Sequence, residues 1–187
     1  MGRRTAVHRG QSLPQHPAVP PGVREVTDRT TKVLTENADD LLRYFRRRVG
    51  SDDAPDLLAD TLMTAWRRAP ALPQDPGEAR AWLFGIAHKT LLNHRRGIQR
   101  RTRLADRVRT LVATADVAPA ADAGLDVRAA INALDPKHAE IVRLVHWEGF
   151  TLAHVADILN QPASTVRNHY QQAKQQLREA LQAAATC

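Results

Sequence analysis

The sequence predicts an all-α protein of two small helical modules joined by a flexible linker. Apolar residues recur at three- and four-residue spacing along most of the chain, which is the period of a helix with one buried face. Aromatic residues, which β-sheets favour, make up only 4% of the 187 residues, although hydrophobic residues make up 43%. A stretch of small residues between 110 and 125 separates two periodic regions and is typical of a linker.

Composition restricts the location and the class of site. No apolar run reaches the roughly 18–20 residues that a helix needs to span a bilayer, so no membrane insertion is expected. The only cysteine is Cys187, which excludes a disulfide scaffold and a multi-cysteine zinc site, and the expected location is the cytoplasm, at the nucleoid. The net charge is +7, and 23 of the 27 basic residues are arginine, which suits phosphate and guanine contacts.

The periodic segments divide the chain into four parts. We expect a flexible, proline-containing tail at 1–30, a first module at 31–109, the linker at 110–125 and a second module at 126–187. In the first module, a helix is expected from Thr35 to Val49. A second should start near Asp52–Pro55, with aspartates capping its N-terminus and Trp66 in the core, and end before Pro70.

A third helix is expected from Arg80 to about Arg96, and the strongest charge cluster of the chain follows it. Seven arginines and one acid, Asp106, lie between Arg95 and Arg109. Such a cluster can be a solvated helix end, but its place directly after an amphipathic helix favours contact with a polyanion.

The second module contains a helix-turn-helix pattern. Thr151 is placed to cap a short helix, Asn160 suits a left-handed turn, and Pro162 suits the start of the next helix. That helix buries one stripe, from Val166 to Leu181, and offers Asn, Gln and Arg on its opposite face. These side chains can bond to adenine and guanine edges in the major groove. The alternative is a plain helical hairpin with a solvated face.

Both modules together resemble the extracytoplasmic-function (ECF) sigma factors of bacterial RNA polymerase. The resemblance covers roughly residues 38–181. The segments DDLLRYFRRRV, DAPDLLADTLMTAWRRAP and ARAWLFGIAHKTLLNHRRGIQRR resemble region 2 of that family, and the segment from Ala133 to Leu181 resembles region 4 with its helix-turn-helix. The implied function is transcription initiation: the protein would bind core polymerase and direct it to promoters, recognising and melting the −10 element and reading the −35 element.

The resemblance also implies site residues and partners. The −35 element would be contacted by Ser164, Thr165, Arg167, Asn168, Gln171, Gln172 and Lys174. The −10 element would be contacted by Trp82, His88, Lys89, Asn93, Arg95, Arg96 and Arg100. Core RNA polymerase would be held at its clamp coiled coil by Asp53, Asp56, Leu57 and Asp60, and its flap by region 4. Promoter DNA and an anti-sigma factor are the other implied partners.

Several departures from the family pattern bear on promoter choice, among them Asn93 where Asp is frequent, the triplet Arg167, Asn168 and His169 in place of a Lys-Ser-Arg-like one, and the three that follow. Gly85 stands where the family commonly has Arg, Lys89 replaces a common Asn, and Asn160 replaces a common turn Gly.

Other classes of function find little support in the sequence. It has no HExxH, GxxxxGK[ST], GxGxxG or GxSxG pattern, so we expect no enzyme, no cofactor and no metal site. His88 and His94 lie on the expected DNA face; solvation is the expected state of both, and a phosphate contact is the alternative. The main alternative is a conventional helix-turn-helix regulator that binds duplex DNA without joining polymerase, and the other is a protein-interaction adaptor without DNA activity.

Overall fold

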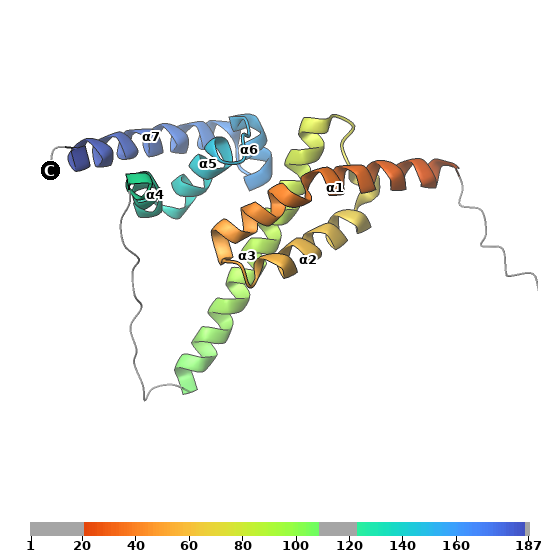
Figure 1. The fold of residues 1–187 in the computed structure, drawn as a ribbon, viewed down its shortest axis with the longest axis horizontal. Coiled ribbons are helices and arrows are strands. Elements are labelled where there is room, and N and C mark those ends of the chain that lie inside the picture. Colours follow the sequence, from red (N-terminus) through yellow and green to blue (C-terminus); the bar gives the residue numbers. More distant parts are fainter. Residues whose placement is uncertain (1–20, 109–122, 186–187) are drawn as a thin grey trace, which may run out of the picture.

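The computed structural model describes residues 21–108 and 123–185, and in those ranges all regular structure is helical. The N-terminal module consists of α1 (Pro21–Val49), α2 (Ala54–Arg67), a 3-10 turn η1 (Ala69–Ala71) and α3 (Pro76–Val108). The C-terminal module consists of α4 (Ala123–Ala133), α5 (Pro136–His146), α6 (Leu152–Leu159) and α7 (Ala163–Ala185). Figure 1 shows α1 and α2 crossing the long α3, with α4 to α7 gathered beside its upper half. The all-α prediction is confirmed.

The first helix begins earlier than the sequence predicts. It starts at Pro21, so residues 21–30, assigned to the tail, form its first turns; residues 1–20 lie outside the described residues. The early turns have no apolar period, which is why the sequence conceals them. Instead Thr30 is buried and donates to the Val26 carbonyl oxygen, and Arg29 donates to the Leu72 carbonyl oxygen at 3.3 Å.

Other predicted boundaries hold more closely. The second helix was placed within two residues of its observed ends. The third is longer than expected at both ends, and of the expected linker only 123–125 are described, in α4. Asp53 does occupy the N-cap of α2, but its side chain makes no capping hydrogen bond, so the capping role predicted for it is wrong.

The buried stripe of α2 differs from the predicted one. Its buried positions are Ala54, Leu57, Thr61 and Ala65, because α2 packs against both α1 and α3. Trp66 lies beyond this stripe and is 47% exposed, so the prediction that it is a core residue is wrong.

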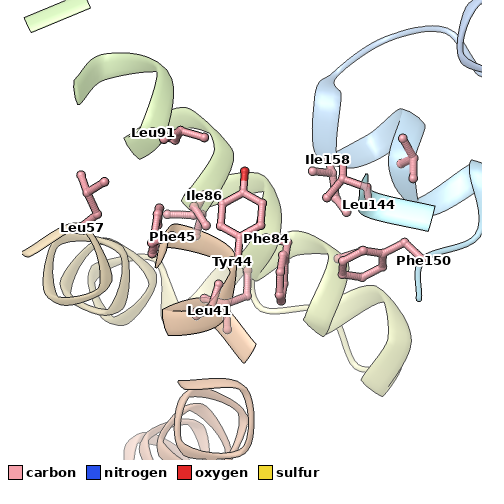
Figure 2. Close-up of a cluster of buried hydrophobic side chains, with 14 of the residues drawn as sticks. Leu41, Tyr44, Phe45, Leu57, Phe84, Ile86, Leu91, Leu144, Phe150 and Ile158 are labelled. Carbon is pink, nitrogen blue, oxygen red and sulfur yellow. The ribbon is translucent and has the colours of Figure 1, made fainter. Parts of the chain in front are cut away.

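The two modules share one hydrophobic core, which the sequence did not predict. Buried residues of α1, α2 and α3 form a single cluster with buried residues of α5, α6 and α7. The close-up in Figure 2 shows Phe84 of α3 and Phe150, before α6, at the centre of the join, with Leu144 and Ile158 beside them. The α3 and α6 helices make one of the most extensive helix contacts of the described chain.

Candidate nucleic-acid interface

The helix-turn-helix of α6 and α7 is built by local capping chemistry. The Thr151 hydroxyl accepts a hydrogen bond from the His154 backbone N–H at 3.2 Å, which begins α6. Asn160 ends α6 in the left-handed region, with φ of 51°. Its backbone N–H and that of Gln161 donate to carbonyls of the last turn of α6. These caps fix the angle at which α7 leaves the turn.

The first half of α7 presents one polar face to solvent. Val166 and Ala173 are fully buried, and Tyr170 and Leu177 pack beside them. The predicted −35 residues lie on the other side: Ser164, Arg167, Asn168, Gln171 and Gln172 are exposed, and Thr165 and Lys174 are partly exposed. The Lys174 ammonium lies 4.9 Å from the centre of the Tyr170 ring, which limits its freedom. The face therefore offers unhindered donors and acceptors for base edges.

Most of the predicted −10 residues form a polar surface along α3. Lys89, Asn93, Arg95, Arg96 and Arg100 are exposed. Arg96 donates to the Asn93 side-chain oxygen at 3.3 Å, which links two of them. Trp82 is partly buried against the shared core. A run of cations on one helix can follow a phosphate backbone.

The two histidines of α3 are not solvated, contrary to the sequence expectation. The Nδ1 atom of His88 lies 4.0 Å from Oε1 of Glu140, and the Nε2 atom of His94 lies 3.3 Å from Oδ2 of Asp53. Burial is the main cause that lowers the pKa of His88, with the charges of Arg48, Arg95 and Lys89 adding to it, and Glu140 opposes the shift. His88 is therefore neutral at pH 7 and faces the C-terminal module.

The predicted polymerase-binding residues divide into two groups. Asp53, Asp56 and Asp60 are exposed, whereas Leu57 is 4% exposed and packs inside the core. The side chain of Leu57 therefore positions α2 from within and does not face a partner, which corrects its predicted contact role.

Sequence reasoning missed two exposed apolar side chains on α2. Met63 is 58% exposed and falls on the same helical face as Asp56 and Asp60, with Trp66 beside it. Large apolar side chains exposed together often mark a binding surface. Met63 and Trp66 lie off the helical stripe that the buried residues of α2 form, and this displacement is the signal that could have identified them.

The contact between the modules contains a group of four charged side chains, the buried Arg48, Glu140 and Glu148 and the partly exposed Arg47, which we call the ionic cluster. The Arg48 side chain is 1% exposed; its Nε donates to both carboxylate oxygens of Glu140 at 3.1 Å, and its Nη1 donates to Glu148 at 3.2 Å. Arg47 pairs with the other oxygen of Glu148 at 2.6 Å. Two arginines of α1 thus hold two glutamates of the C-terminal module.

The electrostatics of the ionic cluster favour its charged form. Burial by itself raises the pKa of Glu140, but the charge and hydrogen bonds of Arg48 outweigh burial, and the pKa of Glu140 lies below its usual value. The Arg48 guanidinium also lies 3.7 Å from the centre of the Tyr44 ring, so an aromatic face covers it.

Aromatic contacts surround the ionic cluster. The rings of Phe84 and Phe150 meet edge to face with centroids 4.9 Å apart. The Arg80 guanidinium lies over both rings, 4.9 and 4.4 Å from their centres, and donates to the Glu148 carbonyl oxygen at 2.9 Å. Arg80 also pairs with Asp40, in the middle of α1, at 3.0 Å, so Asp40 serves this contact.

Comparison with known proteins identifies the modules. The model of Sigma-70 region 2 matches residues 33–102, and that of Sigma-70 region 4 matches residues 124–177. The ECF RNA polymerase sigma factor SigL of Mycobacterium tuberculosis is 26% identical over 151 residues, which are 79% of this chain and 85% of SigL. The chain belongs to the ECF sigma factors. Region 2 precedes region 4 along the chain, so this sigma factor carries the two promoter-binding regions of its family in order.

A second relative agrees with that assignment, and one solved structure shares the fold. The ECF sigma factor SigE of Mycolicibacterium smegmatis is 28% identical over 162 residues, 80% of this chain and 60% of SigE. The structure of the sigma factor RpoE, solved with the anti-sigma factor NepR from Bartonella quintana, has the same fold. It aligns with a TM-score of 0.60 and 24% identity over 85% of this chain and 98% of RpoE.

In residues 21–108 and 123–185 no three His, Cys, Asp or Glu side chains are grouped to hold a metal ion. Among the same residues no helix is long and apolar enough to cross a membrane.

Proposed function

We propose that this sigma factor reads the −35 element with the exposed face of α7, chiefly through Arg167, Asn168 and Gln171. The observation that carries the proposal is the division of α7 into a buried stripe and an exposed polar face at its N-terminal half. Arg can make bidentate bonds to guanine, and Asn and Gln can make them to adenine. The helix-turn-helix would place this face in the major groove.

We further propose that α3 engages the −10 element. Lys89, Arg95, Arg96 and Arg100 would follow the phosphates of the separated strand, and Trp82, beside a pocket, would contact an unstacked base. His88 takes no part in this role, since its ring faces Glu140.

The proposed polymerase contact is the exposed face of α2. It combines the carboxylates of Asp56 and Asp60 with the apolar side chain of Met63, and Trp66 extends it. Charged and apolar groups side by side are typical of a protein-binding surface. The clamp coiled coil is the expected partner there, and an anti-sigma factor covering the same face is a second expected partner. The protein would act in the cytoplasm, at the nucleoid, by binding alone and catalyse no reaction of its own.

The −35 assignment is tested by selecting promoter sequences with holoenzyme from a library randomised at the −35 element. Arg167→Ala and Gln171→Ala should each relax selection at one or two positions, at a cost of about 1–3 kcal/mol per bidentate contact. Arg178→Ala, an exposed arginine farther along α7, is the matched control and should leave the selected sequence unchanged. Identical selected sequences for all variants would refute the α7 assignment.

A further inference from the structure

An open pocket lined by basic side chains lies where α1, α4 and α5 meet. Its volume is about 520 Å³, which is within the range of small-molecule sites. No residue proposed above to contact DNA or polymerase lines it. The lining combines four basic side chains with an amide and an indole: Arg47 of α1, Arg128 and Asn132 of α4, and Arg143, His146 and the adjacent Trp147 at the end of α5.

The basic side chains of this pocket are only partly neutralised. Arg47 pairs with Glu148 at 2.6 Å, but Arg143 donates to the side-chain oxygen of Asn132 at 2.7 Å, which is a neutral partner. Among the carboxylates that the structure describes, none forms an ion pair with Arg128 or Arg143. Two guanidinium groups without a counter-charge, on the wall of a concave surface, concentrate a positive potential in the pocket.

The surroundings of Arg143 show the same excess of positive charge. Burial lowers the pKa of Arg143, the charges of Arg48 and Arg95 lower it further, and Glu140 opposes them only in part. Arg143 nevertheless stays charged at neutral pH, because the pKa of a guanidinium lies far above 7. A bound anion would relieve the repulsion among these arginines, so the pocket favours a ligand with several negative charges.

Trp147 adds an aromatic surface beside these charges. Trp147 is 38% exposed, and the guanidinium carbons of Arg47 and Arg143 lie 5.9 and 5.8 Å from the centre of its ring. These distances are near the limit of about 6 Å for a cation–π contact, so the arginines cover the ring only loosely. An exposed indole beside basic groups is suited to stacking with a nucleobase.

We propose that this pocket binds a nucleoside polyphosphate, with its phosphates on Arg128 and Arg143 and its base against Trp147. The forked guanidinium groups match the geometry of phosphate oxygens. Inorganic polyphosphate would leave the indole unused, and the backbone of duplex DNA held on the exposed α7 face would lie outside the lining. The proposal does not rest on the promoter and polymerase contacts proposed above.

Calorimetric titration of the full chain with ATP, GTP, CTP and UTP, one at a time, tests binding. At least one nucleotide should bind saturably, one molecule per chain, and Arg128→Gln and Arg143→Gln should each weaken it at least tenfold. Arg128 is exposed, so its replacement spares the core and decides the result if Arg143→Gln loses helix content by circular dichroism. Arg178→Gln removes the same charge from an exposed position outside the pocket and should bind as the unmodified chain does. Absence of binding by all four nucleotides, or an equal loss in Arg178→Gln, would overturn the site.

Two competitors distinguish the sources of phosphate. Inorganic tripolyphosphate should bind at least tenfold more weakly than the tightest nucleotide, and Trp147→Leu should abolish that difference. Equal affinities in the unmodified chain would overturn the assignment to nucleotides and leave a phosphate site alone. A duplex oligonucleotide should not displace the nucleotide, and full displacement would assign the pocket to the DNA backbone instead.

Nuclear magnetic resonance of the indole N–H groups locates the ligand. The chain has three tryptophans, so the indole signals are assigned by replacing each tryptophan with phenylalanine in turn. Adding the tightest nucleotide should shift the signal of Trp147 and leave that of Trp66, which lies outside the pocket, in place. An unmoved Trp147 signal at saturation would overturn the proposed position of the base.

Discussion

The strength of the ionic cluster gives the sharpest quantitative prediction. In Glu140→Gln, Arg48 loses a carboxylate whose two oxygens both accept from its Nε at 3.1 Å. Removing one partner of a buried ion pair costs about 3–5 kcal/mol. Glutamine keeps the shape and one acceptor oxygen, so we expect a cost of about 2–3 kcal/mol, the range of a hydrogen bond to a charged group. Since about 1.4 kcal/mol is a factor of ten in an equilibrium constant, the population with the two modules packed together should fall roughly 30- to 140-fold relative to the population with the modules apart.

A double-mutant cycle isolates this interaction. In a Cys187→Ser background, Arg48→Met, Glu140→Gln and the double variant are compared by energy transfer between dyes at Gln99→Cys on α3 and Arg178→Cys on α7, both exposed positions. The titration with urea gives the free energy of opening for each variant. Arg48→Met and Glu140→Gln should couple by at least about 2 kcal/mol, because each substitution removes the same contact. Additive effects, with coupling under about 0.5 kcal/mol, would refute the account of the ionic cluster as a buried interaction between the modules.

Three further outcomes follow from the described residues. Arg95→Gln with Arg96→Gln should weaken DNA binding uniformly across sequences and reduce the slope of log K against log salt by about 1 for each lost phosphate contact. The control Arg67→Gln should change neither the affinity nor the slope. A sequence-selective loss would show that Arg95 and Arg96 read bases. Burial lowers the pKa of His88 in the structure, so the packing of the modules favours the neutral ring. The resulting stabilisation is complete above the unfolded pKa of about 6.5 and is lost as pH falls from there through the lowered pKa. The free energy of opening, measured by the same energy transfer, should therefore fall as pH is lowered below 6.5, and His88→Gln should reduce that dependence; identical pH profiles would contradict it. Met63→Ala should lower affinity for core polymerase by about 1 kcal/mol or more in a direct binding assay, with the fold unchanged, and unchanged affinity would remove α2 from the polymerase contact.

The helices and the turn between α6 and α7 were predictable because their signals are local. A cap such as Thr151, a left-handed position such as Asn160 and an apolar stripe such as that of α7 each act within a few residues. The exposed face of α7 follows from the same stripe, so its candidate residues could be named from the sequence.

The docking of the modules was not predictable in this way. Arg48, Glu140 and Glu148 have the pattern of ordinary surface charges, and only the tertiary structure brings them together. The same cause explains His88, which the helical period places on a polar flank although α5 covers it. The first turns of α1 were missed because they show no apolar period. The residue buried there is Thr30, whose hydroxyl donates a hydrogen bond to the Val26 carbonyl oxygen of the same helix.

The central claim is that this chain directs core polymerase to promoters, and transcription with mapped start sites tests it most directly. Purified core polymerase, this protein and sheared DNA of its own genome are combined, and transcripts are sequenced from their 5′ ends. The account predicts discrete new start sites that appear only with the protein and share two upstream elements. Absence of new starts, with the protein still retained on duplex DNA, would contradict it and favour a conventional helix-turn-helix regulator.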